Sequence, residues 1–444
     1  MNADEGNNPL INNKLRIAVI GAGISGLSMA YFLNKKYDVV LYESAHYLGG
    51  HANTVDVTIA GQTHPVDTGF LVLNDHTYPN LLNLFKELKV ETYPTEMSFA
   101  VSMQAGRFEW AGTSLATLFA CRRNLISPSF WQMIRSVLKF NHHAKSYLER
   151  CIVSQETLGE LLQREGYRGL FVDAYLIPMA AAIWSSTAAD ILQFPASSFL
   201  RFCLNHGLLQ IAGRPQWRTV TGGSRSYVSK ITQTLPDIRL NQAVLAVTRS
   251  QHQVLVQTAN SEETFDHVVF ATHAPTTLAL LNDNASLAER EILQAVQYQP
   301  NTAYLHTDHT LLPKRKGIWS AWNYIESSYI ESSLSNAATN SGANPVCVSY
   351  LINKLQQLPF KTPVIVTLNP TQLPAPNQTI ATFNYEHPVF DQSAILAQAR
   401  LHEIQGVNHT WFVGAWAGYG FHEDGLQSAL NVLKFFGAQP DWMT

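Results

Sequence analysis

Cysteine is scarce in this chain of 444 residues. The four cysteines, Cys121, Cys151, Cys203 and Cys347, are scattered, with no Cys-x-x-Cys pair and no His/Cys cluster at the spacing of metal ligands. The pattern predicts no metal site. It favours reduced, buried thiols in a cytosolic protein.

Charged residues are also few. They make up 14% of the chain, and the net charge of −3 gives no electrostatic basis for binding nucleic acid. Aromatic residues make up 11%. Low charge with these aromatics suits a protein that encloses a large apolar ligand, and it suits an ordinary large core equally well.

The sequence shows neither a signal peptide nor a membrane span. Residues 1–14 are polar, without a basic segment before an apolar core, and we expect them to form a frayed tail. Leu15–Leu33 is apolar, but the glycines inside it predict a buried strand followed by a helix rather than a transmembrane helix.

What the chain does contain is a glycine motif in an informative setting. Gly21, Gly23 and Gly26 follow an apolar strand at 15–20 and open a helix that runs to Lys36. In such a unit the first glycine permits a tight turn, the second admits a pyrophosphate, and the third lets the helix pack on the strand. The stretch therefore predicts a dinucleotide site.

The residues around this motif complete the prediction. The helix N-terminus, where Ile24 and Ser25 lie, offers unpaired N–H groups to phosphates. A second strand, Asp38–Tyr42, ends in Glu43 and Ser44. A carboxylate at this position accepts hydrogen bonds from a ribose.

Strand and helix patterns continue along the chain. We expect a helix over Leu81–Lys89, a hairpin over Phe99–Trp110 and mostly helices over Leu115–Gly213. Further strands are predicted at 238–240, 244–248, 254–258, 268–271, 303–306, 318–324, 346–352, 364–368 and 411–414, with a loop over Ser327–Asn344 and a last helix over Gly425–Phe436.

The fold class predicted from these patterns is mixed α/β. A Rossmann-like FAD/NAD(P)-binding domain would be assembled from segments 14–75, 215–277 and 405–440. The substrate domain would be inserted between them, with a helical part at 76–214 and a sheet part at 278–404.

Further motifs select FAD. Tyr47–Thr54, Asp67–Phe70 and Trp411–Ala429 resemble flavin-contacting segments of the amine oxidase, phytoene desaturase and protoporphyrinogen oxidase superfamily. Thr221–Gly223, Leu240–Val244 and Ala271–Pro275 resemble other segments of that superfamily, in the same order. The resemblance implies an FAD cofactor that contacts Gly49, Gly50, His51, Thr54, Thr68, Gly69, Phe70, Val244, Thr272, Gly414, Asp424, Gly425 and Leu426.

The resemblance also gives two of these segments particular roles. The last residue of the strand at Leu240–Val244 would pair its backbone with adenine. The helix start at Asp424–Leu426 would point N–H groups at the N1–C2=O edge of the flavin, where negative charge develops on reduction.

A narrower resemblance indicates a substrate class. His46–His51, Ser129–Arg135, Gly213–Trp217 and Gly418–Gly425 are similar to oxidoreductase-like proteins found beside, or fused to, cyclopropane fatty acid synthases. This branch implies a lipid or fatty-acyl substrate and a lipid methyltransferase as a partner. It places the protein in the cytoplasm, with peripheral contact to the inner face of the membrane.

The chain departs from the amine oxidases at the flavin. His51 stands where an arginine is usual, Thr302–His306 lacks the lysine expected near N5, and His422 replaces a tyrosine of the aromatic cage. These changes argue against amine oxidation. No cysteine lies in the C-terminal motif, so FAD is expected to bind non-covalently.

Two histidines are candidate catalytic residues. His422 lies where the family places residues over the flavin, and the ordinary pKa of a histidine suits proton transfer. His306 is the next candidate, on the strand that lacks a lysine. Asp424 has a simpler interpretation as an N-cap or first-turn acid of the last helix.

Two other stretches have open alternatives. Trp319, Trp322, Asn323 and Tyr324 are either core residues or a wall of an acyl tunnel. Phe119–Tyr147 carries Arg122, Arg123, Arg135, Lys139 and Lys145 among apolar residues. It is either a solvated helix face or a surface that contacts an anionic bilayer.

The function predicted from the sequence is an FAD-dependent oxidoreductase. It would desaturate or reduce a fatty-acyl or related lipid chain by hydride transfer to or from flavin N5. The alternatives are a flavin amine oxidase and a non-catalytic flavin-binding partner of a lipid methyltransferase.

Overall fold

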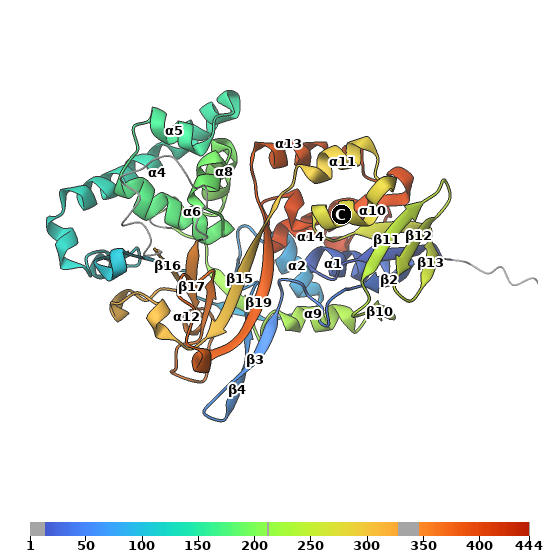
Figure 1. Ribbon diagram of the computed structural model, residues 1–444, viewed down its shortest axis with the longest axis horizontal. Helices are drawn as coiled ribbons and strands as arrows, with labels where there is room; N and C mark the ends of the chain where they lie inside the picture. The colour runs from blue at the N-terminus through green and yellow to red at the C-terminus, as the bar shows by residue number, and fades with distance from the viewer. Residues whose placement is uncertain (1–13, 211–212, 327–345, 444) are drawn as a thin grey trace, which may run out of the picture.

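The computed structural model describes residues 14–210, 213–326 and 346–443. Two units lie side by side (Figure 1). One is built on a parallel sheet and contains the glycine motif. The other combines a larger sheet with a group of helices.

The parallel sheet gathers strands that are far apart in the sequence. Its order is β10 (Asp237–Arg239), β2 (Asp38–Tyr42), β1 (Arg16–Ile20), β14 (His267–Phe270) and β20 (Thr410–Phe412). Each neighbouring pair is parallel. The five strands come from three separate stretches of the sequence, each within a segment predicted for the FAD-binding domain.

Both faces of the parallel sheet are covered. Ile17 and Val19 of β1 pack with helices α1 (Ile24–Leu33) and α14 (His422–Leu433). Ala18 and Ile20 face the opposite way, toward α10 (Ala274–Leu281) and the antiparallel sheet of β11 (Val244–Arg249), β12 (Val254–Thr258) and β13 (Glu262–Phe265). Because both faces are buried, β1, β2 and β14 each contain an unbroken apolar run in sequence.

The second sheet has seven strands. Its order is β19 (Thr379–Pro388), β15 (Tyr298–His306), β18 (Ile365–Leu368), β17 (Cys347–Leu351), β16 (Trp322–Ile325), β7 (Phe99–Met103) and β8 (Phe108–Ala111). All its pairs are antiparallel except β16 with β7.

Helices pack against this sheet at the end where β7 and β16 lie (Figure 1). The longest is α4 (Pro128–Ser154), which contacts α8 (Ala196–Asn205). The other helices of the group are α3 (Leu115–Leu118), α5 (Leu158–Arg164), α6 (Ile177–Trp184) and α7 (Ala188–Gln193).

Smaller elements complete the fold. They are a projecting hairpin of β3 (Thr54–Ile59) and β4 (Gln62–Asp67), a small sheet of β5 (Leu73–Asn74), β9 (Trp217–Val220) and β6 (Thr92–Pro94), and the helices α2 (Pro79–Glu87), α9 (Arg225–Thr232), α11 (Leu287–Gln294), α12 (Ile352–Leu355) and α13 (Gln392–Arg400).

A buried carboxylate ties distant segments together. Asp67 accepts hydrogen bonds from the Thr54 hydroxyl (2.6 Å), from the Ser224 backbone N–H and hydroxyl (2.9 and 2.7 Å), and from the Gln356 side chain (3.2 Å). Burial raises the pKa of Asp67 to about 6, against the lowering effect of these donors. The bonds hold β4, the turn before α9 and the loop after α12 in one arrangement.

Most predicted elements are confirmed. β2 has the predicted bounds, the hairpin at 99–110 forms β7 and β8, and residues 115–205 are largely helical. The four cysteines are buried free thiols. Among the described residues, no helix is both long and apolar enough to cross a bilayer.

Three predictions about elements are wrong. Within 318–324 only Trp322–Tyr324 is strand, because Ser320 and Asn323 bond each other across a turn. Residues 240–243 turn between β10 and β11, with Asn241 in a left-handed conformation (φ 53°), so Val244 begins a strand instead of ending one. The last helix starts at His422, three residues before the predicted start.

Some elements cannot be compared with a prediction. The hairpin β3–β4 and the long strand β19 were not predicted. The expected tail, except Lys14, and the expected loop at Ser327–Asn344 lie outside the described residues.

Candidate active site

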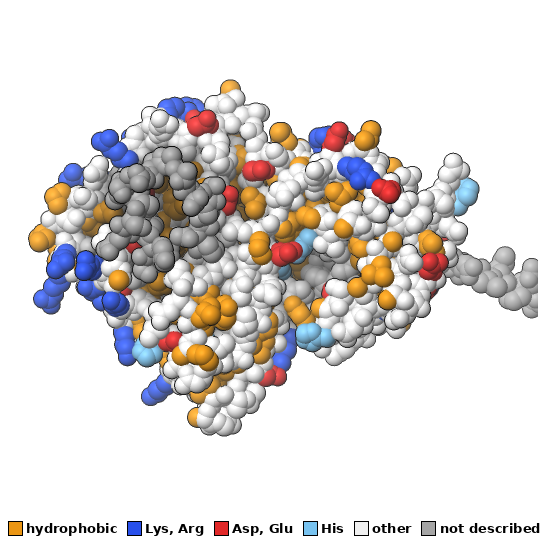
Figure 2. All heavy atoms as spheres, in the orientation of Figure 1, with side chains coloured by type: hydrophobic (Ala, Val, Ile, Leu, Met, Phe, Trp, Pro, Cys, Tyr) orange, Lys and Arg blue, Asp and Glu red, His pale blue; other side chains and the backbone are white. Residues whose placement is uncertain are grey.

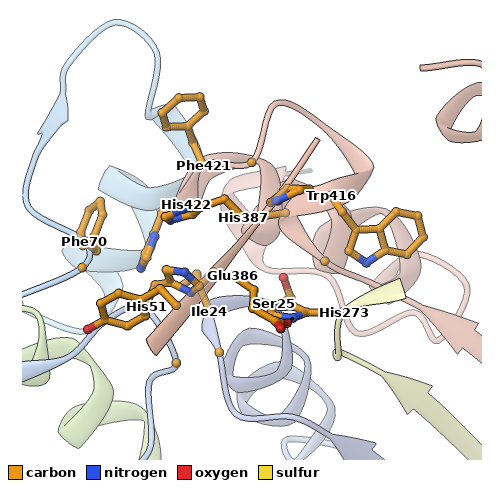
Figure 3. A pocket seen from close by; sticks show the side chains of 18 of the residues that line it. Ile24, Ser25, His51, Phe70, His273, Glu386, His387, Trp416, Phe421 and His422 are labelled. Atoms are coloured by element: carbon orange, nitrogen blue, oxygen red, sulfur yellow. Dashed lines mark hydrogen bonds and ion pairs between the residues drawn. The ribbon is translucent and has the colours of Figure 1, made fainter. Parts of the chain in front are cut away.

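A cavity of about 520 Å³ lies between the two units (Figure 3). Its walls include the carboxyl edge of the parallel sheet, with Gly21 after β1, Glu43 after β2 and Gly414 after β20. Ligands of open parallel sheets bind at this edge. The substrate unit supplies the remaining wall through α6, α8 and several strands of the second sheet.

The three glycines of the motif have different environments. Gly21 has φ 100°, and a side-chain Cβ there would lie 2.8 Å from the Ala271 carbonyl oxygen. A Cβ at Gly26 would overlap the Gly21 carbonyl oxygen, so Gly26 permits close contact of helix and turn. A Cβ at Gly23 meets nothing within 4 Å, so the backbone there borders open space in the cavity.

Glu43 holds the turn in place from the end of β2. Its carboxylate accepts the backbone N–H groups of Ala22 and Ala45, each at 2.8 Å. A carboxylate has about four acceptor positions, so further positions remain for a ligand hydroxyl. Glu43 lines the cavity, as predicted for a ribose-binding acid.

Most of the predicted cofactor-binding residues line this single cavity. They are Gly21, Gly23, Ile24, Ser25, Glu43, Ser44, Gly49, Gly50, His51, Thr68, Gly69, Phe70, Val244, Thr272 and Gly414. Their sequence positions range from the end of β1 to the end of β20. The fold therefore brings together segments that were linked in the sequence analysis only by the order of the motifs.

Five predicted cofactor contacts do not line the cavity. Gly26 packs on the turn, and the Thr54 hydroxyl donates to Asp67. Leu426 is fully buried in the core between α1 and α14. Gly26 has the packing role predicted for it, and contacts of Thr54, Asp424, Gly425 and Leu426 with FAD stay predictions.

The earlier start of α14 changes which of its N–H groups are unpaired. The Gly425 N–H bonds the Phe421 carbonyl (3.0 Å), so the unpaired N–H groups of this helix belong to residues 422–424. Asp424 lies in the first turn, where its carboxylate accepts the Phe421 N–H (2.9 Å). This agrees with its interpretation as a first-turn acid.

Five histidines line the cavity: His51, His206, His273, His387 and His422. Figure 3 labels all of them except His206. The His51 ring stacks on Tyr385 with a centroid distance of 4.9 Å, and its buried Nε2 has no hydrogen-bond partner among the described residues. Burial and the neighbouring histidines hold the pKa of His51 well below its usual value. His273 is paired with Glu386 at 3.0 Å.

His422 occupies a fixed position in the cavity wall. Its ring stacks on Phe70 with a centroid distance of 3.8 Å, and its Nε2 lies 3.2 Å from the Tyr227 hydroxyl. Burial lowers the pKa of His422 to about 3 and raises that of Tyr227, so both groups are neutral near pH 7. A base with so low a pKa accepts protons poorly at neutral pH, so the arrangement favours hydrogen bonding and positioning.

His306 is not part of this site. It lies at the far end of β15, is fully buried, and does not line the cavity. Its Nε2 bonds the Thr367 hydroxyl (2.8 Å), and its Nδ1 accepts the Asp308 N–H (3.1 Å). The prediction of His306 as the second catalytic candidate is therefore wrong, because both nitrogens are used within the fold.

Sequence reasoning missed the cavity wall formed by β19. Tyr385, Glu386 and His387 of this strand line the cavity, and the Tyr385 hydroxyl bonds Thr68 (2.8 Å). In the sequence, Ala381, Phe383 and Tyr385 alternate with Thr382, Asn384 and Glu386, the usual signal of a half-buried strand. That pattern was the available signal for these residues.

Comparisons with known proteins identify the family. A family model described as flavin containing amine oxidoreductase matches residues 24–362, which is more than half of the chain. The chain belongs to the flavin containing amine oxidoreductase family. Its members use FAD, and we describe the protein below as an FAD-dependent oxidoreductase. A search of curated protein sequences finds no significant match.

Solved structures show the same fold at low sequence identity. A CLA-producing fatty acid isomerase from P. acnes has a TM-score of 0.66 at 14% identity, covering 96% of this chain and 99% of its own. A mutant putrescine oxidase has a TM-score of 0.66 at 15% identity, covering 96% of this chain and 99% of its own. Cyclohexylamine oxidase from Brevibacterium oxydans has 0.65 at 13%, with coverages of 96% and 100%.

The cavity of this oxidoreductase fits FAD. The open space at Gly23 and the N-terminus of α1 suit a pyrophosphate, and Glu43 suits the ribose beside it. The unpaired Nε2 of His51 is a polar atom available to the flavin end. These residues would hold the cofactor with no covalent link.

Substitution of Gly23 by valine should remove FAD without unfolding the protein. The new side chain would fill the phosphate space, whereas Gly23 has an ordinary φ of −72° and no neighbour that its Cβ would touch. Gly317→Val is the matched control, since Gly317 also has an open Cβ position and lies outside the cavity.

Flavin absorbance per protein chain, read in the filtrate after denaturation, measures the result. The parent and Gly317→Val should release FAD, and Gly23→Val should release almost none. Full occupancy in Gly23→Val would show that the phosphate site lies elsewhere.

Acid should destabilise this protein through its buried histidines. Burial lowers the pKa of His306 from 6.5 to about 4, so below pH 6.5 the unfolded chain takes up a proton that the folded chain excludes. Stability is therefore full above pH 6.5 and falls as the pH approaches 4. Between pH 6.5 and 5 this residue alone should cost about 2 kcal/mol.

The variant His306→Asn tests this assignment. An asparagine oxygen can still accept the Asp308 N–H but does not titrate. Denaturant unfolding at pH 7 and pH 5 should show a smaller loss of stability in the variant than in the parent. Equal losses in both proteins would contradict the assignment.

Proposed function

We propose that this FAD-dependent oxidoreductase desaturates or reduces a fatty-acyl or related lipid chain. Bound FAD would supply the hydride acceptor or donor. The protein would supply the apolar chamber, exclude water and fix the chain beside the cofactor.

The observation that carries this proposal is the chemistry of the cavity wall outside the glycine turn. Apolar and aromatic side chains dominate it: Leu71, Val72, Met97, Ile183, Trp184, Phe202, Leu208, Trp217, Trp322, Tyr350, Leu368, Phe390, Tyr419 and Phe421. Of the four residues weighed as a tunnel wall, Trp322 lines the cavity. Trp319 instead donates to the Pro313 carbonyl (2.7 Å), and Asn323 to that of Ser349 (3.0 Å).

The cavity wall has few charged side chains, and each of them interacts with another group of the protein. Among the described residues, no lysine or arginine lines the cavity, and its carboxylates are Glu43 and Glu386. Glu43 holds the glycine turn and Glu386 pairs with His273. Neither carboxylate lies among the apolar residues, where it could attract a cationic amine. This arrangement supports an uncharged chain as the substrate over an amine.

The comparisons leave amine oxidation as the second candidate. Two of the solved structures with this fold are named as amine oxidases, and one is named as a fatty acid isomerase. The missing lysine on β15 and the apolar wall support the lipid proposal over the amine proposal.

Anaerobic mixing of the holoenzyme with candidate substrates tests the proposal. Free fatty acids and phospholipids are compared with putrescine and cyclohexylamine, and flavin bleaching is recorded. The reverse direction is tested by reoxidation of the photoreduced enzyme with unsaturated lipids. Change with a lipid alone supports the proposal; bleaching by the amines alone makes the protein an amine oxidase. No change with any compound in either direction would favour the non-catalytic partner of a lipid methyltransferase.

Removal of the His422 imidazole should impair the reaction and spare the cofactor. His422→Phe retains an aromatic ring against Phe70 but loses the contact with Tyr227. At matched FAD content, we expect lipid-dependent flavin reduction to slow about threefold to tenfold, since one hydrogen bond contributes about 0.5–1.5 kcal/mol.

The pH dependence separates the possible roles of His422. Because its pKa is about 3, its ring should stay neutral and the rate should show no inflection from this residue between pH 5 and 8. A rate change below about threefold in His422→Phe would leave the ring with a packing role only.

A further inference from the structure

One end of the molecule combines exposed apolar and basic side chains. We call it the basic tip and define it as residues 114–139, comprising α3, the short helical turn Arg122–Ile126 and the first half of α4. The exposed fraction is 77% for Leu115, 49% for Leu125, 84% for Ile126 and 41% for Trp131. Apolar side chains this exposed and this close in sequence are unusual on a surface that meets only water.

The charge of the basic tip has one sign. From Trp110 to Leu148 the sequence contains no aspartate or glutamate, although the whole chain has a net charge of −3. Arg122, Arg123, Arg135 and Lys139 are exposed. Figure 2 shows Lys and Arg side chains gathered at this end of the molecule.

The exposed apolar residues are not part of the core. Helix α4 buries a separate stripe that includes Phe130, Met133 and Phe140. Trp131 and Leu138, at 41% and 49% exposure, lie outside that stripe. Helix α4 is therefore apolar on more than the face that it packs against the protein.

The basic tip is held in shape by its own contacts. The Trp131 indole N–H donates to the Leu125 carbonyl (2.9 Å), and its ring lies 5.3 Å from that of Phe119. Ser127 caps α4 by accepting the Phe130 N–H. These contacts fix Leu125 and Ile126 in exposed positions, so little ordering is needed on binding.

We propose that the basic tip docks the protein on an anionic lipid bilayer. Leu115, Leu125, Ile126 and Trp131 would enter the interface between headgroups and acyl chains. Arg122, Arg123 and Arg135 would contact lipid phosphates. Nucleic acid would satisfy the basic residues but not the exposed aliphatic ones, so the combination favours a bilayer.

Helix α4 connects this docking surface with α8, which lies against the cavity. Helix α4 packs on α8, and Phe202 of α8 lines the cavity. Docking would therefore bring the substrate unit to the bilayer. The proposal itself rests on the surface residues and holds whether or not the substrate is a lipid.

Sedimentation of the FAD-loaded protein with vesicles tests the proposal. The probes are phosphatidylcholine vesicles with and without phosphatidylglycerol. The charge variant is Arg122→Glu, Arg123→Glu and Arg135→Glu together. Its matched control is Lys86→Glu, Lys361→Glu and Lys434→Glu, which changes net charge equally at exposed sites outside the basic tip.

A second pair of variants tests the apolar residues. Leu125→Ser with Ile126→Ser removes two aliphatic side chains from the basic tip. Ile152→Ser with Val153→Ser is the control, because these two residues are exposed by 50% and 85% near the other end of α4.

We expect the parent to bind the anionic vesicles and to dissociate with added salt. The charge variant should bind about 100-fold more weakly, since each of the three basic residues near an anionic surface contributes about fivefold. The serine variant of the tip should also bind more weakly, and both controls should match the parent. FAD content should be equal in all five proteins.

Either of two results would overturn the proposal. The first is that the parent does not bind the anionic vesicles, or that both tip variants bind them as strongly as the parent. The second is that duplex DNA displaces the parent from these vesicles and that the serine variant of the tip binds DNA as well as the parent does. This result would assign the surface to nucleic acid.

Discussion

The cavity depends on the buried carboxylate of Asp67. The cavity lies between the two units, and its walls come from segments that are far apart in the sequence. Its shape therefore requires those segments to keep fixed positions relative to one another. Asp67 does this by accepting hydrogen bonds from β3, from the turn before α9 and from the loop after α12. The residues that follow it, Thr68, Gly69 and Phe70, line the cavity directly. Loss of one donor would leave a buried charge partly unpaired, a costly arrangement inside a protein.

The parts of the fold that were predictable from sequence are those governed by local rules. The turn at Gly21, the open position at Gly23 and the acid at Glu43 follow from steric and hydrogen-bonding needs within about 30 residues. The discontinuous domain was predicted because apolar strands and motif order mark its pieces. β19 was missed because its side chains are mostly only partly buried, which weakens the apolar alternation.

The site was less predictable than the fold because its chemistry depends on burial. The ordinary pKa of a histidine made His422 a candidate base, but the surrounding protein lowers its pKa to about 3. His306 was placed near the flavin by its strand, yet its position along β15 puts it beside Thr367. Strand register and solvent exclusion are tertiary properties, and neither can be obtained from residue type and spacing.

The discontinuous parallel sheet also has a consequence for biosynthesis. β1 and β2 leave the ribosome early, but β14 and β20, which complete one side of the sheet, follow more than 200 and almost 400 residues later. Contacts between segments so far apart in sequence form slowly, because a long loop must close before they contribute stability. The cofactor cradle is complete only after Gly414, about 370 residues beyond Glu43, has been translated. The apolar wall of the cavity therefore forms over a long stretch of synthesis, during which its exposed segments are prone to aggregate.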